Sequence, residues 1–144
     1  MFYICGATVH TIEIVHYIKR KEFKKIINIE KDPRFEENGS SVFNLQEGPY
    51  KTTITFHRCN VSIYCKVDLV KLARKDYLDE NDFSFIDKEI QNYIYNLLKI
   101  ELETINIKRY DFRVDFKISP EIKEFIMNIL GNDALSKTNE YIRN

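Results

Sequence analysis

The stretch Lys108–Ile118 reads Lys-Arg-Tyr-Asp-Phe-Arg-Val-Asp-Phe-Lys-Ile and alternates apolar and charged residues almost throughout. In an extended strand, side chains two positions apart share a face. We therefore predict a strand over Thr104–Ile118, with Phe112 and Val114 buried on a core and the charges on the other face. The apolar face is Tyr110, Phe112, Val114, Phe116 and Ile118, and the polar face is Arg109, Asp111, Arg113, Asp115 and Lys117.

The chain has 144 residues, with 22 basic and 22 acidic side chains. This length fits one domain over 1–144 that is large enough to bury a hydrophobic core. A net charge near zero argues against a protein that coats nucleic acid without specificity, because such binding needs a basic excess. A local basic patch is compatible with this balance.

The sequence carries no apolar run long enough to cross a membrane, since charged residues or histidines interrupt each one. The first residues lack the basic start and apolar segment of a signal peptide, so we expect a cytoplasmic protein without membrane partners. Three cysteines do not make a disulfide framework, and we expect reduced thiols. The abundance of Ile, Asn, Lys, Tyr and Phe reflects AT-rich codons, which suggests an AT-rich bacterium or one of its phages or plasmids.

Alternation and β-branched residues predict further strands, and the last two of these are close enough to form a hairpin. Turn residues in Asp32–Ser41 and Asp76–Asn81 predict loops. The further strands are Val9–Ile18, Ser41–Leu45, Lys51–His57 and Asn60–Leu69.

Three segments have helical features. Lys19–Ile27 fits either a short helix that buries Phe23, Ile26 and Ile27 or another strand, and we favour the helix. Phe83–Leu98 repeats apolar residues every three or four positions, and Ser84 or Asp82 is the expected N-cap. A last helix begins at the N-cap Ser119 with Pro120 in its first turn and ends before Gly131, followed by a polar tail over about 132–144. Its apolar stripe is Ile122, Ile126, Met127 and Leu130.

Strands outnumber helices in this order and neighbouring strands pair locally. We therefore predict an α+β fold with a mostly antiparallel sheet and two or three helices on one face, in a ferredoxin-like or split βαβ arrangement.

The one dense basic cluster is Lys19, Arg20, Lys21, Lys24 and Lys25. Such a cluster forms either a solvated helix face or a contact surface for phosphates or an acidic protein. We include Arg109 and Arg113 of the long strand as further candidates for binding nucleic acid or a partner.

The polar face of the long strand allows three interpretations. It is a surface salt-bridge ladder, a charged surface that docks a partner, or a divalent-cation site in which Asp111 and Asp115 join Glu101 or Glu103. A zinc site at His57, Cys59 and Cys65 lacks a fourth ligand, and the scattered glycines form no phosphate-binding loop. We expect no cofactor.

The helix Phe83–Leu98 followed by the strand Ile107–Asp115 resembles a segment of the rolling-circle replication initiators of plasmids and phages. In that family, an amphipathic helix leads into a strand of the form Thr-Arg-Ile-Asp, with a second Asp four residues on. Arg109, Asp111 and Asp115 match this pattern, whereas Lys108 and Tyr110 replace the usual Thr and Ile.

Initiators of this family nick one DNA strand with a tyrosine and a divalent metal. This chain lacks the family's His-hydrophobic-His pair, and Tyr141 lies in a polar segment. The resemblance therefore implies a small, non-enzymatic protein of a mobile element that binds DNA or a replication complex. An inhibitor that occludes a host nucleic-acid-handling protein, such as an anti-CRISPR protein, is the alternative, and a metal-dependent DNA nickase that uses Asp111 and Asp115 is a further one.

Overall fold

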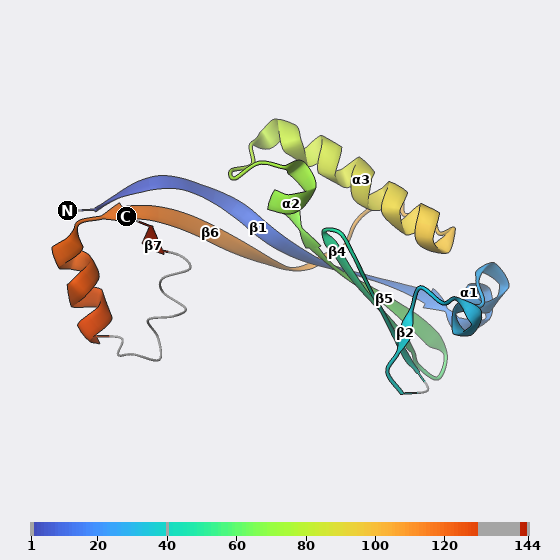
Figure 1. Ribbon diagram of the computed structural model, residues 1–144. Coiled ribbons are helices and arrows are strands. Elements are labelled where there is room, and N and C mark those ends of the chain that lie inside the picture. Colours follow the sequence, from blue (N-terminus) through green and yellow to red (C-terminus); the bar gives the residue numbers. More distant parts are fainter. Residues whose placement is uncertain (1, 40, 130–141, 144) are drawn as a thin grey trace. The chain divides into compact units, whose positions relative to one another are not determined.

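The computed structural model describes residues 2–39, 41–129 and 142–143 (Figure 1). Its internal contacts divide the chain into two compact units. We call Val9–Asp111 the core unit, and Met1–Thr8 together with Phe112–Asn144 the terminal unit. The sequence pattern does not indicate this division, because both long strands run through the boundary.

The strands and helices are labelled as in Figure 1. The strands are β1 (Phe2–Lys19), β2 (Glu36–Glu37), β3 (Val42–Glu47), β4 (Tyr50–Phe56), β5 (Asn60–Asp68), β6 (Ile107–Ile118) and β7 (Ile142–Arg143). The helices are α1 (Arg20–Ile26), the 3-10 turn η1 (Ile29–Lys31), α2 (Leu69–Ala73), α3 (Glu80–Leu98) and a further helix over 120–129.

The sheet has the strand order β2-β3-β4-β5-β1-β6-β7. Each pairing from β2 through β5 to β1 is antiparallel. Helices α2 and α3 connect β5 to β6, and these two strands flank β1, which is a split βαβ arrangement. The predicted α+β class with a mostly antiparallel sheet is confirmed.

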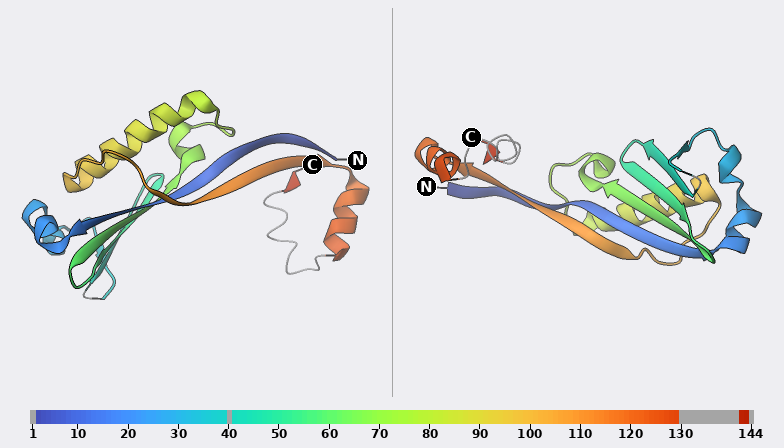
Figure 2. Two further views of the ribbon diagram at one scale, coloured as in Figure 1. Left: turned by 180° about the vertical axis from the view of Figure 1, so that it is seen from behind. Right: turned by 90° about the horizontal axis from the view of Figure 1, so that it is seen from below.

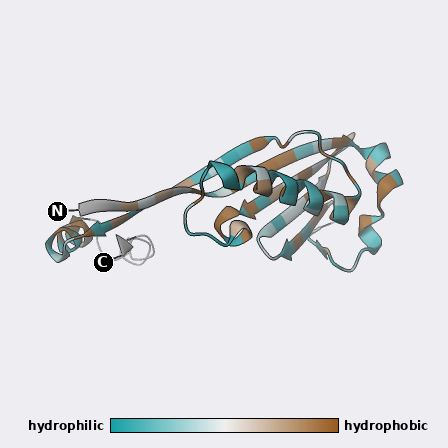
Figure 3. Ribbon diagram, turned by 90° about the horizontal axis from the view of Figure 1, so that it is seen from above, coloured by the Kyte–Doolittle hydropathy of each residue, from teal (hydrophilic) through white to brown (hydrophobic). Residues whose placement is uncertain are grey.

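The core unit is a sheet with α3 packed on one face (Figure 1). Alternation along β5 aims Val61, Ile63, Cys65 and Val67 at α3, and all four are at most 2% exposed. From α3, Ile86, Ile90, Ile94, Leu97 and Leu98 meet them, at the three- and four-residue spacing predicted for this helix. Figure 3 looks down onto α3 and shows hydrophobic and hydrophilic residues alternating along it.

The N-terminus of α3 differs from the prediction. Asp79 is the N-cap, and its side chain accepts a hydrogen bond of 2.9 Å from the backbone N–H of Asn81. Asp82, one of the two expected caps, instead accepts from the N–H of Asp79 at 2.8 Å and completes a capping box. Because α3 begins at Glu80, the expected cap Ser84 lies inside it. Phe83, placed on the apolar stripe, is 47% exposed.

Two aromatic residues of β6 do not pack as predicted. Phe112 is 60% exposed and Tyr110 is 63% exposed, so the expected burial of this face is wrong at both positions. Val114 and Phe116 are half-buried, and Ile118 is buried. Alternation determines which residues share a face of a strand, but burial also needs a second element to cover that face. No described element covers these two rings.

Smaller differences lie in the connections. Helix α1 buries Phe23 completely but leaves Ile26 exposed, contrary to expectation. The segment predicted as a loop before β3 contains β2, and α2 follows β5 without a sequence signal that we recognised.

In the terminal unit, Ser119 caps the helix over 120–129 as predicted, because its Oγ accepts from the N–H of Ile122 at 3.4 Å. Strand β7 pairs parallel to β6 at Phe116 and Lys117. The expected end of the helix, with Leu130 and Gly131, and most of the polar tail lie outside the described residues. In the described part of the chain, no helix combines the length and apolar character needed to cross a membrane.

Candidate nucleic-acid interface

A basic surface pocket forms where β1 ends and α1 begins, beside the turn between β4 and β5. Its volume is about 570 Å³. We call it the basic pocket. It is lined by Lys19, Arg20, Lys21, Lys24, Arg58, Cys59 and Asn60.

Arg20, the first residue of α1, contacts the turn between β4 and β5. The backbone N–H of Arg20 donates to the carbonyl of Cys59 at 2.9 Å, and its guanidinium Nη1 donates to the carbonyl of His57 at 3.3 Å. The guanidinium carbon also lies 5.5 Å from the centre of the Phe56 ring, within the range of a cation–π contact. Arg20 therefore ties the two segments together, while its neighbours along the chain face solvent.

Packing beneath α1 keeps its basic residues on the surface. Phe23 is 0% exposed and meets the ring of Phe56 edge-on, with centroids 5.5 Å apart. When a helix buries one of its faces, the residues on its other faces point toward solvent. Lys19, Lys21 and Lys24 are exposed, as is Arg58 across the pocket.

The basic pocket brings together four of the seven basic residues that the sequence singled out. Lys25 is exposed but does not line the pocket. Arg109 lies on β6 and pairs with Asp111 at 3.2 Å, and Arg113 belongs to the terminal unit. Sequence reasoning missed Arg58, because only the pairing of β5 with β1 brings the predicted hairpin turn beside the basic residues of α1.

No carboxylate is among the residues that line the basic pocket. Like charges that line one pocket repel each other, so a bound anion is favoured there. Flexible lysines bind phosphate as point charges, and the planar guanidinium group of Arg58 adds several N–H donors. The lining side chains therefore supply N–H donors of the kind that a phosphate group accepts from.

The two aspartates proposed as metal ligands each have an arginine partner two positions earlier. Asp111 pairs with Arg109, and Asp115 pairs with Arg113 at 3.4 Å. These two pairs agree with the surface salt-bridge ladder, one of the three interpretations of the polar face of this strand. Among the described residues, no group of three or more His, Cys, Asp or Glu side chains converges as a metal site would require. The metal assignment of Asp111 and Asp115 remains a prediction.

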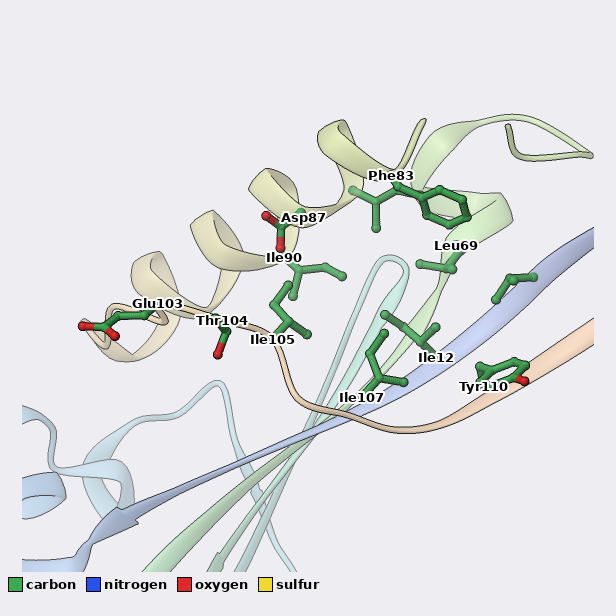
Figure 4. A pocket seen from close by; sticks show the side chains of 12 residues that line it. Ile12, Leu69, Phe83, Asp87, Ile90, Glu103, Thr104, Ile105, Ile107 and Tyr110 are labelled. Atoms are coloured by element: carbon green, nitrogen blue, oxygen red, sulfur yellow. The ribbon is translucent and has the colours of Figure 1, made fainter. Parts of the chain in front are cut away.

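A second pocket of about 500 Å³ lies between α3 and strands β1 and β6 within the core unit (Figure 4). We call it the apolar groove. Leu69, Ile86 and Ile90 form its floor, and the exposed side chains of Phe83 and Tyr110 lie at its mouth. Its remaining lining residues are Val9, Ile12, Asp87, Glu103, Thr104, Ile105 and Ile107. Sequence reasoning did not identify this groove, because Leu69 and Ile105 belong to the predicted strands Asn60–Leu69 and Thr104–Ile118, and a local pattern does not show how these segments lie against α3.

The cysteines are free thiols, with Cys5 and Cys59 exposed and Cys65 buried. Cys65 receives a contact from the Thr52 hydroxyl at 3.6 Å, and this hydroxyl is 2.8 Å from the hydroxyl of Tyr93. These groups belong to the packing between the sheet and α3. Comparison of the chain with protein-family models, with curated proteins and with solved structures finds no match.

Proposed function

We propose that the chain is a small, non-enzymatic protein of a mobile genetic element that binds DNA through the basic pocket. The observation that supports this most is that Arg58 lines the same pocket as Lys19, Lys21 and Lys24. No carboxylate is among the lining residues of this pocket. Phosphates of a DNA backbone are anions that match such a surface. The resemblance of α3 and β6 to rolling-circle initiators is an independent reason to consider DNA or a replication complex.

The direct test reverses three exposed lysines, as Lys19→Glu, Lys21→Glu and Lys24→Glu, and measures DNA binding by fluorescence anisotropy. We expect affinity to fall at least tenfold at low salt and the dependence of affinity on salt to weaken, because fewer counterions are released. A control variant with Lys71→Glu, Lys88→Glu and Lys99→Glu has the same net charge but carries its changes on α2 and at α3. Equal losses in both variants would contradict a role for the basic pocket.

The apolar groove supports a second candidate function, occlusion of a host nucleic-acid-handling protein. Its floor is apolar, and two exposed carboxylates, Asp87 and Glu103, are among its lining residues. A partner segment that fits this groove would insert an apolar side chain and place a Lys or Arg near the two carboxylates. Calorimetry with a peptide that carries Leu or Phe flanked by arginines tests this candidate. Phe83→Ser should abolish the binding heat if the groove holds the anchor, and unchanged binding would exclude the groove.

A metal-dependent nickase that uses Asp111 and Asp115 is a further alternative. It predicts that Mg²⁺ or Mn²⁺ raises the melting temperature and that the double change Asp111→Asn, Asp115→Asn removes this shift. Because both carboxylates already pair with arginines, we expect no shift. A metal-dependent shift together with nicking of single-stranded DNA would replace the non-enzymatic proposal.

A further inference from the structure

The sheet of the core unit has a second face, opposite α3, whose residues alternate with the core residues of the same strands. Figure 2 (right) looks onto this face, with β1 in blue and β5 in green in front of α3. We call it the open face. Its central part carries Glu13, Val15, Tyr17 and Lys19 from β1, Lys51, Thr53 and Thr55 from β4, and Ser62, Tyr64 and Lys66 from β5.

Tyr17 is the most exposed aromatic residue of the open face, with 63% of its surface accessible. It pairs with Ser62 of β5 in the strand register. The Oγ of Ser62 lies 3.1 Å from Nε2 of His57, so polar side chains lie beside the tyrosine ring. An exposed ring amid small polar neighbours is a surface on which a base can stack.

The next residue on the same face connects Tyr17 with the basic pocket. Lys19 lies two positions further along β1 and pairs with Asn60, and both residues line the basic pocket. Residues two apart on one face of a strand are about 7 Å from each other. The exposed ring of Tyr17 is therefore adjacent to the basic pocket.

A second basic group lies toward the other end of the open face. Lys51 of β4 pairs directly with Lys66 of β5, and both side chains are exposed. Like charges in directly opposed positions of a sheet repel each other, so a bound anion would relieve the repulsion. Glu13 is the cross-strand neighbour of Lys66 on β1, and it accepts a hydrogen bond from the hydroxyl of Tyr64. Another carboxylate, Glu36, lies out on β2 and pairs with Asn44.

Tyr64 lies between the two basic groups. Partial burial and the hydrogen bond to Glu13 raise the pKa of Tyr64 to about 12, so its phenol is neutral at physiological pH. The distance along β4 from Lys51 to His57 is about 20 Å at 3.3 Å per residue. The open face thus has cations near both ends and tyrosine rings between them.

We infer that the open face binds a single-stranded polynucleotide, whose phosphates contact Lys19 and Arg58 at one end and Lys51 and Lys66 at the other, with a base stacked on Tyr17. This inference rests on the proposed function and specifies the class of its ligand. Bases within a duplex are stacked on one another and do not offer a free face to Tyr17. The open face therefore selects single strands.

The test compares a fluorescein-labelled 12-nucleotide oligo-dT, the matching oligo-U and a 12-base-pair duplex, by anisotropy at low salt. We expect a single strand to bind at least tenfold more tightly than the duplex. Tyr17→Ala should weaken single-strand binding about tenfold, whereas Tyr17→Phe should retain it, because stacking needs the ring and not the hydroxyl. The control is Tyr95→Ala, which removes an exposed ring of α3.

A second variant separates binding from folding. Lys51→Gln combined with Lys66→Gln removes the opposed charges, so the melting temperature should stay equal or rise while single-strand affinity falls severalfold. Duplex binding equal to single-strand binding, or an unchanged affinity in Tyr17→Ala, would overturn this inference but leave the proposed function in place. Failure of all three probes to bind would overturn the proposed function itself.

Discussion

The backbone N–H of Arg20 donates a hydrogen bond to the carbonyl oxygen of Cys59 at 2.9 Å. This bond fastens the first residue of α1 to the β4–β5 turn and so brings Arg58 to the basic pocket. Without it, the basic residues of α1 would be an ordinary charged segment on a surface.

Arg58→Ala should weaken DNA binding severalfold and reduce the slope of log affinity against log salt by about 1, because one phosphate contact is lost. The melting temperature should not change, since Arg58 is exposed in a turn. Anisotropy titrations at three salt concentrations measure the slope. An unchanged slope in Arg58→Ala would place the DNA elsewhere, and Lys88→Ala on α3 provides the matched control.

Phe112→Asp should leave the protein folded, with a cooperative melting transition close to that of wild type. The ring is 60% exposed, so a carboxylate at this position stays hydrated and little apolar contact is lost. Ile54→Asp is the contrasting change, because Ile54 is 0% exposed in the core beneath α3 and a buried charge should prevent folding. Circular dichroism melts of both variants test the corrected facing of β6.

The exposure of Phe112, which we expected to be buried, shows what the sequence could and could not predict. Alternation in Lys108–Ile118 located the strand, and the spacing in Phe83–Leu98 located α3, because both patterns record which residues share a face. Which face another element covers depends on the tertiary arrangement, which a local pattern does not contain.

The candidate site shows the same limit. The basic cluster at Lys19–Lys25 was visible in the sequence, and its exposure follows from burial of Phe23. Arg58 and Tyr17 were not recognised, because their importance arises from the cross-strand register of β1 with β5. The apolar groove combines residues from five segments and has no sequence signature.

Asp79→Ala should lower the free energy of unfolding by about 1 kcal/mol, because the N-cap of α3 loses its side-chain acceptor. Asn92→Ala, at an exposed position in the middle of the same helix, should cost nothing or stabilise slightly, since Ala favours the helix. Urea unfolding of both variants gives the comparison. Equal destabilisation by the two changes would exclude the capping role of Asp79.

Alkaline pH should destabilise the fold through Cys65. Burial raises the pKa of this thiol to about 11, from an ordinary value of 9.0. Below pH 9 the thiol is protonated in both states, so its contribution to stability is complete. Between pH 9 and 11 the unfolded chain loses the proton first, and the free energy of unfolding falls by up to about 1.4 kcal/mol per pH unit.

Urea unfolding of wild type and Cys65→Ala at pH 8, 9 and 10 tests this expectation. Buried tyrosines add a decline of the same sign near pH 10, so the quantity of interest is the difference between the two proteins. That difference should shrink as pH rises, because only wild type loses the contribution of the thiol. A constant difference from pH 8 to 10 would show that the Cys65 thiol does not couple to folding.

We propose that a cationic surface of this nearly neutral protein binds DNA phosphates. The most direct measurement is the affinity of the unmodified protein for the 12-nucleotide oligo-dT as a function of salt concentration. With three to five phosphates neutralised, log affinity should fall linearly with log salt, with a slope between about −2 and −3.5. Absence of measurable binding to both this oligo-dT and the 12-base-pair duplex at 50 mM salt, or an affinity that does not depend on salt, would contradict the account.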